Sequence, residues 1–315
     1  MIPMKLKRLL YSLGAVLVFG CQSLHAQRSA DDTKQLTELR AKAEGGDARA
    51  QCTLGEVFAL GKLGVAKNEV EAIKWWRKSV EQNDALAQRQ LGICYLAGEG
   101  VTKDEVEAAK WFRKSAEQDD EVAQNNLGTC YALGQGVAKD DAEAVKWYRK
   151  AAEKGNAYSQ NYLGVCYLTG KIVQKDEAEA VKWFRKAAEQ LLAEAQWRLA
   201  VCYKKGIGVT KDLSEAVKWY RKAAEQNYPS AQHQLGFIYG EGKLVAEDVA
   251  EAYKWFFLAE AQGYQPSKEI IADMNTMLSR DQIAEGKRRA NEWLERYKKL
   301  SAIADHFRSS GGKDQ

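Results

Sequence analysis

The side chains that could support chemistry are few, and most lie at regular positions along the chain. Three glycine pairs have the spacing of a phosphate-binding loop: Gly98-Glu99-Gly100, Gly134-Gln135-Gly136 and Gly206-Ile207-Gly208. None has the third glycine of a dinucleotide-binding loop, and a helical pattern rather than a strand precedes each pair. These glycines therefore predict tight turns between paired helices, with no cofactor site.

Cysteines recur at one position, which raises the question of disulfides or a metal site. Cys94, Cys130, Cys166 and Cys202 are 36 residues apart, and no Cys-x-x-Cys spacing is present. Equivalent positions in stacked helical units are separated by about 8 to 10 Å or more. Because a disulfide spans only about 4.4 to 6.8 Å between Cα atoms, the pattern predicts free, buried thiols and no metal site.

The sequence offers few histidines that could act in catalysis. The chain has three histidines, of which His25 lies in the N-terminal leader described below and His306 lies near the C-terminal end. His233 would have to serve any hydrolytic triad, and no Gly-x-Ser-x-Gly elbow supplies a nucleophile. We therefore predict that the protein is not an enzyme and has no catalytic residues.

An internal repeat organises most of the chain. Six tryptophans follow one another at intervals of 36 residues, a period typical of a helical solenoid: Trp75, Trp111, Trp147, Trp183, Trp219 and Trp255. In the copy around Trp183, a first helix is predicted to end at Gly170, and Gly164 is small enough to let a neighbouring helix approach closely. A second helix carries an apolar stripe through Trp183 and Phe184. Acidic residues suited to its N-terminus stand before it in four copies, at Asp104, Asp140, Asp176 and Asp212.

These motifs closely resemble the Sel-one-like repeat family, which is related to tetratricopeptide repeats. The resemblance rests on Leu-Gly-x-x-Tyr, as at 163–167, Gly-x-Gly-Val, as at 206–209, and Trp-x-x-Lys-Ala-Ala-Glu, as at 219–225. It implies an all-α fold, a right-handed solenoid of paired antiparallel helices. Cysteine-rich secreted members pair two cysteines in each repeat and bind or weakly hydrolyse penicillin. This chain lacks the second cysteine, which argues against that activity.

A basic and aromatic motif recurs with the repeat and resembles a nucleic-acid-binding pattern. In the fourth copy it reads Lys182-Trp183-Phe184-Arg185-Lys186. The tryptophan belongs to the apolar stripe, however, and Glu179 and Glu189 lie within one helical turn of the basic residues. We therefore expect a solvated helix face and no nucleic-acid partner.

The first residues have the order of a secretory signal peptide. Lys5, Lys7 and Arg8 precede an apolar run at 9–19, which is too short to span a bilayer. Cleavage after Ala26 would give a soluble periplasmic or secreted protein. The alternative is acylation of Cys21, which would give an outer-membrane lipoprotein anchored only through that lipid. Removal of residues 1–26 lowers the net charge from +4 to about +1.

The resulting domain prediction has four parts. Residues 1–26 form the signal peptide, 27–46 an N-terminal capping helix, 47–263 six tandem repeats, and 264–315 C-terminal capping helices with a disordered tail from residue 308 on. Ser279 and Gln282 form a capping box at the start of a charged helix that continues through Trp293 and Tyr297.

Binding is expected where the first helices face away from the core, along the concave groove of the superhelix that the resemblance implies. Aromatic side chains, arginine and asparagine suit recognition of a protein or an extended peptide. The candidate residues are Arg89, Asn125, Asn126, Tyr158, Asn161, Tyr162, Trp197, Arg198, His233 and Phe237. Packing of Trp197 against the next repeat is an equally good interpretation of that residue.

The sequence thus predicts a bacterial, exported, monomeric scaffold that binds one or more proteins or peptides through this groove. Such an adaptor would act in envelope assembly, signalling or host interaction. Two alternatives are a cell-wall-directed hydrolase of the β-lactamase-like kind and an outer-membrane lipoprotein of a secretion or assembly complex.

Overall fold

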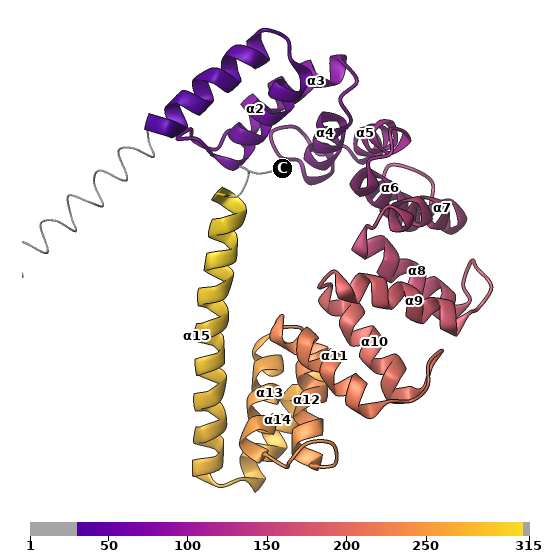
Figure 1. Cartoon of the computed structure of the whole chain (residues 1–315), viewed down its shortest axis with the longest axis vertical. Coiled ribbons are helices and arrows are strands. Elements are labelled where there is room, and N and C mark those ends of the chain that lie inside the picture. Colours follow the sequence, from indigo (N-terminus) through magenta and orange to yellow (C-terminus); the bar gives the residue numbers. More distant parts are fainter. Residues whose placement is uncertain (1–29, 311–315) are drawn as a thin grey trace, which may run out of the picture. The chain divides into compact units, whose positions relative to one another are not determined.

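Helices are the only regular secondary structure in the part of the chain that the structure describes (Figure 1). The computed structural model describes residues 30–310, with side chains as far as residue 304. The first helix covers residues 30–44, and the others are α2 (Ala48–Leu60), α3 (Glu69–Glu81), α4 (Ala85–Ala97), α5 (Glu105–Glu117), α6 (Glu121–Leu133), α7 (Asp141–Glu153), α8 (Ala157–Thr169), α9 (Glu177–Glu189), α10 (Ala193–Lys205), α11 (Leu213–Glu225), α12 (Pro229–Glu241), α13 (Val249–Ala261), α14 (Gln265–Met277) and α15 (Arg280–Ser310). Among these described helices, none combines the length and the apolar character needed to cross a bilayer.

The described part of the chain divides into two compact units, one up to residue 139 and the other from residue 140 on. In the first unit α2 packs on α3 and α4 on α5, and the second helix of each pair also packs on the first helix of the next pair. The second unit repeats this order from α7 to α14. Stacked helix pairs are the arrangement expected of an all-α solenoid, so the predicted fold class is confirmed.

Both ends of the helices are fixed by residues that the repeat supplies. The aspartates predicted to cap the second helices do so, and Asp176 accepts a hydrogen bond of 2.9 Å from the backbone N–H of Glu179. The first helices end at glycines in the left-handed conformation, where a side chain would be strained: Gly61, Gly98, Gly134, Gly170, Gly206 and Gly242. The Gly-x-Gly segments therefore contain helix ends, as predicted, with no strand before them.

Close packing within a helix pair depends on a glycine in the middle of the first helix. A Cβ atom added at Gly164 would lie 2.5 Å from the ring of Phe184, and one at Gly92 would lie 2.6 Å from Phe112. In α10 the same position is Ala200, which is completely buried. Most pairs therefore need the absence of a side chain here so that the aromatic ring can contact the first helix directly.

We expect Gly164→Ala to destabilise the protein by about 1–3 kcal/mol, because the new methyl group overlaps Phe184 in a packed core. Gly240→Ala is the matched control. Its Cβ would meet only the Cβ of Ala252, at 3.6 Å, and it should stabilise α12 by about 0.5–1 kcal/mol. Urea unfolding of the two variants measures the difference, and equal effects would contradict the packing role of Gly164.

The two ends of the repeat array are covered by helices that differ from the repeat. Leu36 and Leu39 of the first helix pack against a cluster that contains Leu54 and Trp75 of the first repeat. At the other end, Ser279 and Gln282 form the predicted capping box before α15, with bonds of 3.0 and 3.2 Å. These helices cover apolar surface that no further repeat buries.

The C-terminal helix extends further than the sequence indicated. A disordered tail was expected from Arg308, but α15 continues to Ser310. Serine and arginine cost little in a helix, so residues 308–310 can continue the turns before them. The remaining tail, 311–315, lies outside the described residues, as do the predicted signal peptide, Cys21 and residues 27–29.

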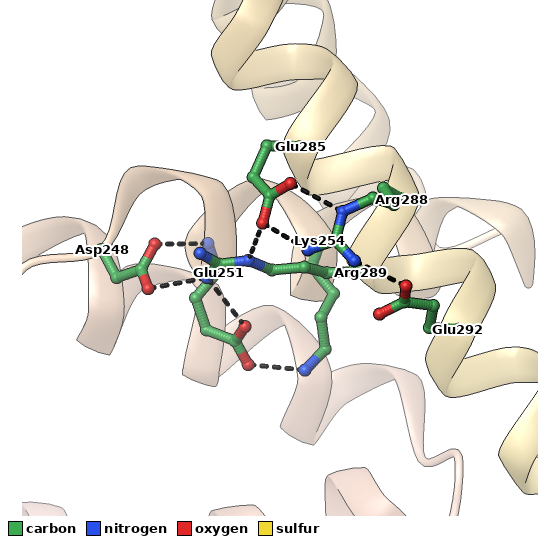
Figure 2. A network of polar contacts seen from close by, with 7 residues as sticks. All are labelled: Asp248, Glu251, Lys254, Glu285, Arg288, Arg289 and Glu292. Carbon is green, nitrogen blue, oxygen red and sulfur yellow. Dashed lines mark hydrogen bonds and ion pairs between the residues drawn. The ribbon is translucent and has the colours of Figure 1, made fainter.

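A network of ion pairs joins the first part of α15 to α13 (Figure 2). Arg289 lies at its centre, with Nη1 at 2.7 Å from Asp248 and 3.4 Å from Glu251, and Nε at 2.8 Å from Glu285. Asp248 is also the N-cap of α13. Arg288, by contrast, pairs only within α15, with Glu285 and Glu292. Arg289 is therefore the residue that links the two helices.

Replacing Arg289 with glutamine should lower the free energy of unfolding by about 1 kcal/mol, whereas Arg288→Gln should change it less.

The stabilisation that this ion-pair network provides depends on pH. Hydrogen bonds from Arg288 and Arg289 lower the pKa of Glu285 from 4.5 to about 2, so the unfolded chain binds this proton more readily. Stabilisation by the network should thus be lost as the pH falls from about 4.5 towards 2. Thermal melts of both variants across this range test it, and an undiminished difference from wild type at pH 2 would argue against it.

Candidate functional site

The candidate binding residues lie on the first helices, at positions that the core of the repeat leaves over. In α8 the core takes Leu163, which is fully buried, and Gln160, whose amide donates a 3.1 Å hydrogen bond to the carbonyl of Ala152. The second, fifth, sixth and ninth residues of each first helix remain. We call the surface formed by these four positions the first-helix face.

Two candidates on this face are exposed aromatic side chains. Tyr158, the second residue of α8, is 67% exposed, and Phe237, the ninth residue of α12, is 37% exposed. Ile93 has the same exposure at the ninth position of α4 in the first unit. Exposed aromatic rings of this size can bury substantial apolar area when a partner covers them.

Trp197 and Arg198 lie together on α10. The Trp197 ring is half-buried and packs against Tyr228, with 6.0 Å between ring centroids. The guanidinium of Arg198 lies 5.7 Å from the Trp197 ring and forms a 2.5 Å ion pair with Glu194. Trp197 therefore contacts the next repeat and still presents part of its ring to solvent.

Tyr162 packs inside its own unit more than the sequence suggested. Its ring lies 4.1 Å from that of Tyr148 on α7. Burial raises the pKa of Tyr162 to about 12, as expected for a phenol that is largely removed from water. Only part of this ring remains available for a partner.

Two of the candidate residues are buried. Asn161 is 7% exposed, and its Oδ1 atom has no hydrogen-bond partner. His233 is 8% exposed, and its Nδ1 lies 2.8 Å from Oγ of Ser267. Burial lowers the pKa of His233, which favours the neutral imidazole. These two side chains are therefore buried beneath the first-helix face and do not form part of its solvent-exposed surface.

The polar candidates of the first unit are partly engaged within it. Arg89 forms a 2.8 Å ion pair with Asp120, the N-cap of α6. Asn125 and Asn126 are half-buried on α6. A partner that used Arg89 would have to share it with Asp120.

Sequence reasoning missed Tyr228, which completes the aromatic surface next to Trp197. It stands at the N-cap of α12 and its side chain forms no capping hydrogen bond, whereas the side chains of Asp84, Asp120 and Asn156 cap the first helices of earlier repeats. The signal was present in the sequence, because a capping residue is replaced by an aromatic one directly before Pro229. Ring contacts join Trp197 to Tyr228 and His233 to Phe237, and no ring contact joins Tyr158 to any of them.

The cysteines have the environment expected of core residues. Cys52, Cys94, Cys130, Cys166 and Cys202 are buried and free, as predicted. Burial, the main cause, raises the pKa of Cys94 to about 11, which disfavours the reactive thiolate. In the described part of the chain no group of three or more metal-ligating side chains is present.

The repeat architecture agrees with a known family. The Sel1 repeat model matches six segments, at residues 48–84, 85–120, 122–156, 157–190, 193–228 and 229–264. The chain belongs to the Sel1 repeat family. This confirms the resemblance drawn from the repeated motifs.

Two solved Sel1-type structures are similar to this chain. One is c5321, a protective antigen present in uropathogenic Escherichia coli strains, with 30% identity and a TM-score of 0.64, over 82% of this chain and 64% of that one. The other is a Sel1 repeat protein from Oxalobacter formigenes, with 34% identity and a TM-score of 0.63, over 73% of this chain and 96% of that one. The chain thus spans less than two thirds of the E. coli antigen. A comparison with curated proteins gives no match.

Membership in the family indicates a general role. Sel1 repeats are commonly scaffolds for protein–protein interaction, and the fold is generally non-catalytic. Specific partners do not follow from it.

Proposed function

We propose that this protein is an exported scaffold that binds a protein or peptide partner through its first-helix face. The observation that carries this proposal is the set of large aromatic side chains on successive first helices of the second unit. Tyr158 on α8, Trp197 on α10 and Phe237 on α12 each keep solvent-accessible ring surface. Because burial of aromatic rings dominates many interfaces, a partner that crosses these helices would gain most of its binding energy there.

The repeat explains why these positions are available for recognition. Packing buries the glycine, leucine and alanine positions of the first helices, whereas the second and ninth residues are half-buried or exposed in every repeat. Those positions differ from one copy to the next within this chain, and several carry apolar groups that face solvent. A surface of this kind can bind a partner without loss of the stack.

The double variant Tyr158→Ala/Trp197→Ala should lose partner capture while it keeps its helicity. Crosslinking in the native cell, followed by mass spectrometry, identifies the captured protein, and its affinity is then measured with purified components. We expect at least a tenfold loss, because two ring anchors are removed. Lys146→Ala/Lys182→Ala, which changes exposed residues of the second helices, is the control. Equal binding by the wild type and the first-helix variant would refute the assignment of this face.

Export is the second part of the proposal, and the sequence of the first 26 residues supports it. Mass spectrometry of the protein purified from its own cells should find a chain that begins at Gln27. A diacylated N-terminal Cys21 would instead establish the lipoprotein alternative. An intact chain that still begins at Met1 would exclude export by either route.

The cysteine-rich hydrolase alternative gains no support from the described residues. The secreted members that it resembles pair two cysteines in each repeat, whereas here each of the first helices α2, α4, α6, α8 and α10 carries one free cysteine. We therefore propose a scaffold rather than an enzyme.

A further inference from the structure

A cleft of about 390 Å³ lies between α15 and the last repeats of the second unit. Helices α11 and α13 form one wall, and Tyr239 of α12 contributes beside them. The other wall is α15, which runs alongside α13 and then extends past the repeat helices of this unit (Figure 1). The cleft therefore exists only because α15 leaves the path of the repeat.

The α15 wall carries an apolar stripe that continues the contact with α13, and Arg296 lines the cleft beside it. Ala290 is fully buried, and Trp293, Tyr297 and Leu300 follow it at alternating intervals of three and four residues. Such a spacing places them on one side of the helix. Trp293 stacks on Tyr297, with 5.1 Å between the rings, whereas Leu300 is 60% exposed. The side of α15 that is buried against α13 at Ala290 is therefore exposed to solvent at Leu300.

Trp255 distinguishes this place from the equivalent place in the other repeats. In the preceding repeat, Lys222 lies 4.0 Å above the ring of Trp219. The corresponding residue after Trp255 is Leu258, so here Lys254 lies over the ring, at 4.1 Å, and Trp293 of α15 packs against Trp255 with 6.0 Å between ring centroids. Among the described repeat tryptophans, Trp255 is therefore the one that a second tryptophan contacts.

Charges around the cleft are predominantly positive. Arg221 donates a 3.1 Å hydrogen bond to the hydroxyl of Tyr239, and among the side chains that the structure describes neither Arg221 nor Arg296, on the other wall, pairs with a carboxylate. Lys254 is already paired with Glu251, at 2.5 Å. The remaining charged residues of the lining are two cations, Arg221 and Arg296, and one acid, Glu225.

Three occupants fit these features less well than an acidic partner. Residues 311–315, Gly-Gly-Lys-Asp-Gln, have no apolar side chain to place against Leu300. The leader carries three cations and no acid. A second copy would bring two α15 segments together, and residues 295–304 hold three cations and one acid, so like charges would meet.

We propose that this cleft docks an acidic peptide segment of a partner protein, separately from the first-helix face. A large apolar side chain of the peptide packs against Tyr297 and Leu300, and neighbouring carboxylates pair with Arg221 and Arg296. The volume suits one large side chain with its adjacent backbone.

A phage library of random twelve-residue peptides, panned on the purified full-length protein, tests the proposal. Peptides that bind the variant Arg221→Glu/Arg296→Glu are removed first, so that the surviving peptides depend on the cleft. We expect enrichment of Asp and Glu around Trp, Phe or Leu. Fluorescence polarisation with the enriched peptide, synthesised with a fluorescein label, then gives affinities.

The dissociation constant should rise at least tenfold in Arg221→Glu/Arg296→Glu and in Leu300→Ser, and it should rise with salt concentration. Tyr158→Ala/Trp197→Ala is the control and should bind normally, which separates this cleft from the first-helix face. Circular dichroism checks that the variants fold, as expected for exposed residues. The proposal fails if no peptide survives the depletion, if survivors are not acidic, or if Leu300→Ser binds as wild type. Sedimentation velocity that shows a dimer dissociated by Leu300→Ser would instead identify a second copy as the occupant.

Discussion

The contact between an aromatic ring of the second helix and a glycine of its partner first helix, which most of the helix pairs make, is the constraint on which the stack depends. Phe184 lies where a Cβ of Gly164 would be, and Phe256 has the same relation to Gly236. A single helix pair leaves the other side of these rings exposed, so neighbouring repeats must cover it. Local packing and long-range stacking are therefore satisfied by the same side chains.

Because these core positions carry the packing, the remaining positions of each first helix can differ between repeats. Where the fifth residue is Trp197 it contacts Tyr228, and where it is His233 it contacts Ser267 and is buried. The same repeat position thus supplies surface in one copy and core in another. Both side chains also contact the tyrosine at the N-cap of the next first helix, Tyr228 and Tyr264 respectively.

The last repeat meets a different requirement, because no seventh repeat covers it. Helix α15 closes it by packing Gly286 against Tyr253 and Trp293 against Trp255, and Arg289 fixes the crossing point. A helix of 31 residues is much longer than the 13-residue α13 that it covers. Its second half therefore carries apolar residues past the contact, and the cationic cleft lies at that transition.

The sequence by itself determined the helix pairs, their caps and the buried free cysteines. These features follow from local rules: a period of 36 residues, aspartates before the second helices and glycines after the first. Only the tertiary structure decided that Asn161 and His233 are buried, that Tyr228 joins the aromatic surface, and that α15 forms a cleft with α11 and α13. The reason is physical. Burial at these positions depends on side chains about 30 or more residues away in the chain, and a heptad-like stripe on α15 is compatible with more than one packing partner.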